Sequence, residues 1–190
     1  MVSRRDFVLA AAAFAAWPAR ADPALLDRLR AGGHVLLMRH GSTEPGLGDP
    51  AGYRLDDCAT QRNLSEAGRG EARRVGERLR EARVPIDRVY TSPWCRCRET
   101  AKLAGFGDPE DWEPLGSFFD APQRKDDFTE RMKKRIAGYG ARPLKGNVLM
   151  VTHHVNILAV TGEAVGTGEI VAVRPDGCCN VRRTGRIKLA

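Results

Sequence analysis

Arg39 and His40 are the first residues whose types and position suggest chemistry. The apolar run at residues 34–38 predicts a short buried strand, and it ends on these two side chains before the loop-forming residues 41–46. In open α/β sheets, ligands bind at the carboxyl ends of strands. A neutral imidazole is a nucleophile, and a guanidinium binds phosphoryl oxygens through a planar fork. The pair therefore predicts phosphoryl chemistry.

Two further predicted strands also end on reactive side chains. Residues 86–91 read as a strand that ends before Ser92, and residues 146–151 read as a strand followed by Thr152 and His153. Arg96 opens a helix predicted over 96–104, where the N-terminal dipole favours anions. We expect these residues to meet at one edge of the sheet. The remaining predictions are helices at 24–30, 65–83, 124–139 and 155–160, strands at 169–173 and 179–189, and irregular structure at 105–117.

Four blocks in this order resemble the histidine phosphatase superfamily, which has the phosphoglycerate mutase-like fold. They are Arg-His-Gly at 39–41, Asn-Leu-Ser-Glu-Ala-Gly at 63–68, Ser-Pro-Trp-Cys-Arg-Cys-Arg-Glu-Thr-Ala at 92–101 and Val-Thr-His-His at 151–154. Cys97 stands where the family usually has Ala, and His154 where it often has Gly. The resemblance implies an α/β three-layer sandwich, with a mostly parallel central sheet flanked by helices.

The resemblance also implies a mechanism. His40 would attack phosphorus and form a phosphohistidine that water hydrolyses, while Arg39, Arg96 and His153 surround the transferring group and neutralise its charge. His40 must then be neutral at its attacking nitrogen, and His153 works best protonated. Because three cations surround the phosphoryl group, we expect no metal ion and no other cofactor.

Other side chains are candidates for contacts to the substrate. We expect Arg62, which precedes the 63–68 block, and His154 to bind it. A general acid for the leaving oxygen is harder to assign, because Ser117 stands where many relatives carry a carboxylate. Asp120, Glu113 and Glu44 all remain candidates.

Residues 1–21 have the order of an export signal. A twin-arginine motif at 3–9 precedes an apolar stretch at 7–17, and small residues at 19 and 21 form a cleavage site. We predict cleavage after Ala21 by way of the Tat export machinery, a periplasmic location and a histidine phosphatase domain at 22–190. The apolar stretch is shorter than the ~20 residues of a spanning helix, and no Cys lies beside the cleavage site, so no stable membrane anchor is expected.

The charge favours a small anionic ligand. The chain of 190 residues has a formal net charge of +7, and removal of residues 1–21 would lower it to +5. The basic residues are spread over amphipathic helices and lack the interleaved aromatic side chains that stack on single-stranded nucleic acid. We therefore expect a small phosphorylated substrate and no nucleic acid.

Five cysteines remain after signal removal: Cys58, Cys95, Cys97, Cys178 and Cys179. In an oxidising compartment, disulfides become available to them. A bridge from Cys58 to Cys95 or Cys97 would join two segments that both border the expected pocket. The alternative is that these are free, buried thiols.

The leading function is an exported phosphomonoesterase acting on a phosphorylated sugar or another cell-envelope substrate. One alternative is a phosphatase of protein phosphohistidine, and another is a non-catalytic phosphate- or anion-binding protein on the same fold. Metal binding by His153, His154, Cys178 and Cys179 is disfavoured, because adjacent ligands chelate one metal awkwardly.

Overall fold

The computed structural model describes residues 22–141, 145–176 and 180–189, so residues 1–21, Cys178 and Cys179 lie outside the described residues. Its helices are α1 (Pro23–Arg30), α2 (Glu66–Glu81), α3 (Cys95–Ala104), α4 (Lys125–Ala141) and α5 (His154–Thr161). Its strands are β1 (Val35–Arg39), β2 (Ile86–Thr91), β3 (Glu110–Asp111), β4 (Asn147–Thr152), β5 (Ile170–Asp176) and β6 (Asn180–Ile187).

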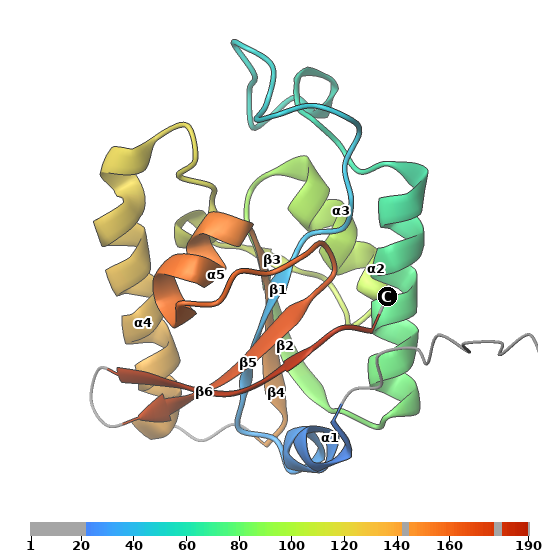
Figure 1. Cartoon of the computed structure of the whole chain (residues 1–190), viewed down its shortest axis with the longest axis vertical. Coiled ribbons are helices and arrows are strands. Elements are labelled where there is room, and N and C mark those ends of the chain that lie inside the picture. The colour runs from blue at the N-terminus through green and yellow to red at the C-terminus, as the bar shows by residue number, and fades with distance from the viewer. Residues whose placement is uncertain (1–21, 142–144, 177–179, 190) are drawn as a thin grey trace, which may run out of the picture.

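The strands form one six-stranded sheet in the order β3-β2-β4-β1-β5-β6 (Figure 1). The first four strands in this order run parallel to their neighbours, whereas β5 pairs antiparallel with both β1 and β6. Strand β1 is central, and its Leu37 lies between Met150 of β4 and Val171 of β5. The mostly parallel sheet predicted from the sequence is confirmed.

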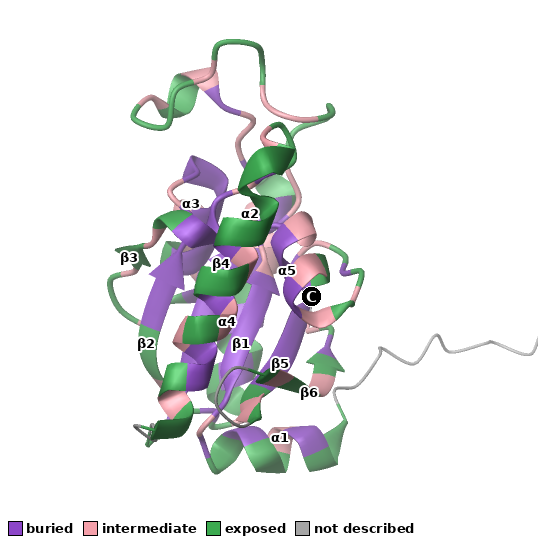
Figure 2. Cartoon of the chain, turned by 90° about the vertical axis from the view of Figure 1, so that its left-hand side faces the viewer, coloured by how far each residue is buried: buried purple, intermediate pink, exposed green. Residues whose placement is uncertain are grey.

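Helices cover both faces of the sheet and make three layers. Alternate side chains of β1 point to opposite faces, as in any strand. Leu36 and Met38 pack with residues of α1, α2 and α3, while Val35 and Leu37 pack with residues of α4 and α5. Figure 2 shows the central strands buried along their length and the outer helix faces exposed. Because both faces are covered, every residue of β4 is buried, and its apolar residues 148–151 show no alternation.

The segment 105–117, predicted to be irregular, contains the two-residue strand β3. Glu110 and Asp111 pair with Tyr90 and Thr91 of β2. A strand this short has no periodicity to detect, so the sequence pattern could not reveal it. Among the helices that the structure describes, none is long and apolar enough to cross a membrane.

The turn after β1 packs directly against the first turn of α2. Ser65 caps this helix as predicted, accepting a hydrogen bond from the N–H of Gly68 at 3.2 Å. A Cβ added to Gly68 would lie 1.9 Å from the carbonyl oxygen of Ser42, so only glycine permits this approach. Glu71 accepts hydrogen bonds from both the N–H and the hydroxyl of Ser42 at 2.8 Å. These contacts fix the chain immediately after His40.

Candidate active site

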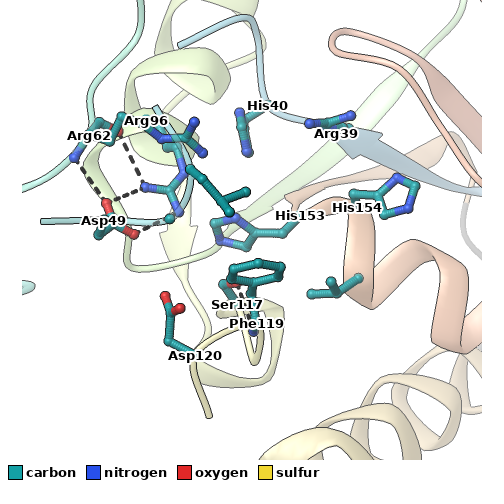
Figure 3. A pocket seen from close by; sticks show the side chains of 13 residues that line it. Arg39, His40, Asp49, Arg62, Arg96, Ser117, Phe119, Asp120, His153 and His154 are labelled. Atoms are coloured by element: carbon teal, nitrogen blue, oxygen red, sulfur yellow. Dashed lines mark hydrogen bonds and ion pairs between the residues drawn. The ribbon is translucent and has the colours of Figure 1, made fainter. Parts of the chain in front are cut away.

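A cavity of about 330 Å³ opens beyond the carboxyl ends of β1 and β4 (Figure 3). All four predicted catalytic residues line it, namely Arg39, His40, Arg96 and His153. Arg62 and His154, predicted to bind substrate, also line it. The structure therefore brings together six side chains that lie up to 115 positions apart in the sequence.

The backbone fixes which nitrogen of His40 is free. The Nδ1 atom lies 2.8 Å from the carbonyl oxygen of Gly41. Because a carbonyl oxygen only accepts hydrogen bonds, Nδ1 carries the proton and Nε2 keeps its lone pair. The N–H of His40 also donates to the carbonyl of Thr152 at 3.1 Å, which ties the residue to the end of β4. This tautomer is the one that a nucleophilic Nε2 requires.

His40 is neutral at physiological pH. Burial lowers its pKa to about 3, and the nearby positive charge of Arg96 adds to the effect. The His40 residue is only 5% exposed. The neutral nucleophile predicted from the sequence is therefore what the surroundings favour.

His153 occupies the wall of the cavity beside the end of β2. Its Nε2 lies 2.8 Å from the hydroxyl of Ser92, which in turn accepts a hydrogen bond from the N–H of Trp94 at 3.3 Å. The hydroxyl thus holds the imidazole in a fixed orientation. Ser92 was noted at a strand end from the sequence, but its contact with His153 depends on tertiary packing.

That His153 works best protonated stays a prediction about the site with a phosphoryl group bound. Burial lowers its pKa well below the usual value, and His40, Arg96 and Arg39 lower it further. The imidazole is therefore neutral at neutral pH. A doubly negative phosphoryl group in the cavity would oppose this effect, because an anion favours the charged imidazole.

Arg39 and His154 are anchored to the same backbone carbonyl. A terminal nitrogen of Arg39 donates to the oxygen of Val165 at 2.8 Å, and Nδ1 of His154 lies 3.1 Å from that oxygen. The shared acceptor fixes both side chains on one side of the two catalytic histidines (Figure 3). His154 thus has a positioning contact in addition to its place in the lining.

Arg96 makes a buried ion pair that the sequence analysis missed. Its terminal nitrogens donate to the two carboxylate oxygens of Asp49 at 2.7 and 3.1 Å. Their side chains are 5% and 2% exposed. Asp49 stands between Gly48 and Pro50 in a long loop, and an Asp in that setting reads as an ordinary turn residue. No sequence signal distinguishes it.

Arg62 reaches the cavity from the same loop. Its N–H donates to Asp49 at 2.9 Å, and its guanidinium donates to the carbonyl of Gly46. Among the described residues, the buried Nε–H groups of three lining arginines have no acceptor. They belong to Arg39, Arg62 and Arg96. A buried N–H without a partner is costly, so these donors favour an anionic ligand.

Only one of the three candidate general acids lines the cavity. Asp120 does, as does Ser117. Glu113 lies outside the lining and pairs with Arg124 and Arg131 near the surface. Glu44 is exposed and is not part of the lining. The expectation that Glu113 or Glu44 faces the site is therefore wrong, because each is turned to solvent.

A disulfide joins Cys58 to Cys95, with the Cα atoms 5.7 Å apart. The predicted bridge is confirmed, and its partner is Cys95. Cys97 is a free thiol in the core, where burial raises its pKa to about 12 and leaves it unreactive. Within the described ranges, no cluster of three or more His, Cys, Asp or Glu side chains could hold a metal ion.

Comparison with known proteins agrees with the site geometry. Residues 35–118 match the family described as the histidine phosphatase superfamily (branch 1). The resemblance to this superfamily is confirmed. The matched segment includes Arg39, His40, Arg62 and Arg96, and the match supports phosphatase activity. None of the curated proteins matches the sequence.

Several solved structures share the fold. The protein histidine phosphatase SixA, complexed with tungstate, has a TM-score of 0.56 at 21% identity over 82% of this chain and 96% of that one. YhfR of Bacillus stearothermophilus gives 0.57 at 20% identity over 80% and 95%. Phosphoserine phosphatase of Entamoeba histolytica, in complex with 3-phosphoglyceric acid, gives 0.58 at 15% identity over 82% and 96%. At these identities the likeness shows a common fold.

Proposed function

We propose that this protein is a phosphomonoesterase that works through a phosphohistidine on His40. The observation that carries the proposal is the hydrogen bond from Nδ1 of His40 to Gly41, which leaves Nε2 unprotonated in a cavity lined by three arginines. Nε2 attacks phosphorus as the ester P–O bond breaks, and the leaving oxygen takes a proton. Water then breaks the P–N bond and releases orthophosphate.

Charged donors around the phosphoryl group supply the catalysis. Arg39 and Arg96 present N–H groups to its oxygens, and His153 gains a proton or donates its remaining N–H as charge builds up. Asp120 lines the cavity, and we assign it the role of protonating the leaving oxygen. These roles need no metal ion, since the transferred charge is met by side chains.

A small phosphorylated molecule is the substrate class that we favour. A cavity of about 330 Å³ suits a compound of metabolite size. Ser117 and Asp120 at its rim offer hydrogen-bond partners to hydroxyl groups, as on a phosphorylated sugar of the cell envelope. A protein phosphohistidine is the second candidate, since SixA is a protein histidine phosphatase with this fold.

We further propose that the protein is exported to the periplasm and begins at Asp22. The order of charged, apolar and cleavable parts in residues 1–21 supports this, as does the disulfide, which persists in oxidising compartments. N-terminal sequencing of protein from the periplasm tests it, and Arg4→Lys with Arg5→Lys should retain the protein in the cytoplasm. An intact Met1 on exported protein would contradict the proposal.

Turnover of p-nitrophenyl phosphate by residues 22–190 tests the activity, with and without EDTA. The wild type should hydrolyse the ester equally in both, vanadate should inhibit competitively, and His40→Ala should be inactive. A phosphorylated-sugar panel and a phosphohistidine-carrying protein then separate the two substrate classes. Binding of orthophosphate without turnover of any ester would instead establish a non-catalytic anion-binding protein.

A further inference from the structure

The buried pair formed by Asp49 and Arg96 is the feature that the proposed chemistry leaves unexplained. A phosphoryl group needs guanidinium donors, yet Asp49 already engages both terminal nitrogens of Arg96. In Figure 3 this pair lies on one side of His40 and His153, with Arg39 on the other side. A carboxylate therefore lies inside a site built for an anion.

Asp49 is held in place by donors from three directions. Besides the two bonds from Arg96, its carboxylate accepts the indole N–H of Trp94 at 3.0 Å and the N–H of Arg62 at 2.9 Å. Burial alone would raise its pKa, but these hydrogen bonds and the charge of Arg96 together lower it. Asp49 is ionised and its acceptor sites are occupied, so its carboxylate is held in one position in the folded site.

The orientation of the Arg96 guanidinium is restricted by these contacts. One terminal nitrogen also donates to the carbonyl of Arg62 at 3.3 Å. The Nε–H of Arg96 is buried and has no acceptor among the described residues. The pair with Asp49 thus occupies one N–H of each terminal nitrogen and leaves the Nε–H as a buried donor without a partner in the described part of the chain. It also offsets one of the three guanidinium charges in the lining.

We propose that Asp49 is a positioning residue for Arg96, which fixes its orientation and weakens the binding of the orthophosphate product. The inference rests on the proposed phosphatase function. Three uncompensated arginines would hold a phosphate dianion tightly and slow its release. With Asp49 in place, the site keeps the directed donor that the transition state uses and binds the free product less strongly.

Asp49→Asn is the matched substitution, because it removes the charge and keeps the size of the side chain. We expect orthophosphate to bind about fivefold more tightly or better, since the charge of Arg96 is no longer offset. We expect kcat to fall about tenfold or more, since Arg96 loses its fixed orientation. Asp56→Asn removes an exposed carboxylate from the same loop and should change neither quantity.

The decisive readout is a double-mutant cycle with Arg96→Ala, measured by calorimetric titration with orthophosphate and by turnover of p-nitrophenyl phosphate. If Asp49 orients Arg96, Asp49→Asn should change kcat by no more than about twofold in the Arg96→Ala background. An equal loss of kcat in both backgrounds would overturn the proposal. So would weaker phosphate binding by Asp49→Asn, or a rise in its kcat.

The titration also separates this proposal from the proposed function. If the wild type binds orthophosphate but hydrolyses no ester, the phosphatase function fails, and the affinities of the wild type and Asp49→Asn still decide whether Asp49 weakens phosphate binding. If the wild type is active but the cycle shows no coupling, only the role of Asp49 fails. Thermal unfolding of each variant confirms that the affinities compare folded proteins.

Discussion

The imidazole rings of His40 and His153 meet edge to face, with their centroids 5.3 Å apart. Both rings are buried among arginines, so adding a proton to either brings two positive charges together in a poorly solvated site. The apolar core and the cations of the site thus act in the same direction. They keep both histidines neutral, as attack by His40 on phosphorus requires.

Acid should destabilise the protein through these histidines. The pKa of His40 is about 3 in the folded protein and about 6.5 in an unfolded chain, so the unfolded chain binds the extra proton between these values. Stability is then full above pH 6.5 and is lost as the pH falls through this window. For His40→Asn, the loss between pH 7 and pH 5 should be about 2 kcal/mol smaller than for the wild type.

Denaturant unfolding at the two pH values provides the measurement. His153 contributes a loss of the same sign, so the variant should retain part of the pH dependence. An identical loss in the wild type and His40→Asn would show that His40 titrates normally in the folded protein.

Ser92→Ala should impair catalysis without removing the site. The variant loses the hydroxyl 2.8 Å from Nε2 of His153, so the imidazole is no longer held in one orientation. We expect kcat to fall about tenfold with little change in KM, because the contact matters most in the transition state. Thr91→Val, which removes a buried hydroxyl bonded only to a neighbouring carbonyl, should change kcat by less than about twofold. Steady-state kinetics would contradict this account if both variants behaved alike.

The disulfide should stabilise the fold and respond to reductant. It joins two cysteines that lie 37 positions apart in the sequence. On the chain-entropy model, a loop of this length adds about 3–4 kcal/mol to the free energy of unfolding. Cys58→Ser should unfold at correspondingly lower denaturant concentration, and reductant should have no further effect on it. Cys97→Ala is the control, because it keeps the bridge and should remain sensitive to reductant. A wild type that is indifferent to reductant would argue against the bridge.

Gly68→Ala should disturb the turn that carries His40. The added Cβ would lie 1.9 Å from the oxygen of Ser42, so backbone must move, at a cost of about 1–3 kcal/mol. Gly70→Ala in the same helix is the matched control. Its Cβ would meet only the mobile end of Arg74, and alanine favours the helix. Thermal unfolding of both variants gives the comparison, and equal stability would disprove the close approach.

Much of the fold followed from local patterns. The buried strands ending on Arg39 and Thr152 are continuous apolar runs, and the helix capped by Ser65 carries its apolar side chains at helical spacing. Because parallel strands present their carboxyl ends at one edge, the meeting of His40 with His153 was predictable from order alone.

The rest of the site depends on a loop whose path no pattern encodes. Asp49 lies in a loop without a periodic hydrophobic pattern, and its partner Arg96 is 47 positions away in the sequence. The choice among Asp120, Glu113 and Glu44 likewise depends on which carboxylate the folded loops turn inward. The lowered pKa of His153 was likewise not predictable from the sequence, because burial and the nearby positive charges both depend on tertiary packing.

The most direct measurement of the central claim is the trapping of a covalent intermediate. The enzyme is mixed with a radiolabelled phosphomonoester, quenched in alkaline denaturant within milliseconds and digested for peptide mapping. The account predicts a base-stable, acid-labile phosphoryl group on His40 in the wild type and none in His40→Ala, which should also be inactive. Near wild-type turnover by His40→Ala, or a label on another residue, would contradict it.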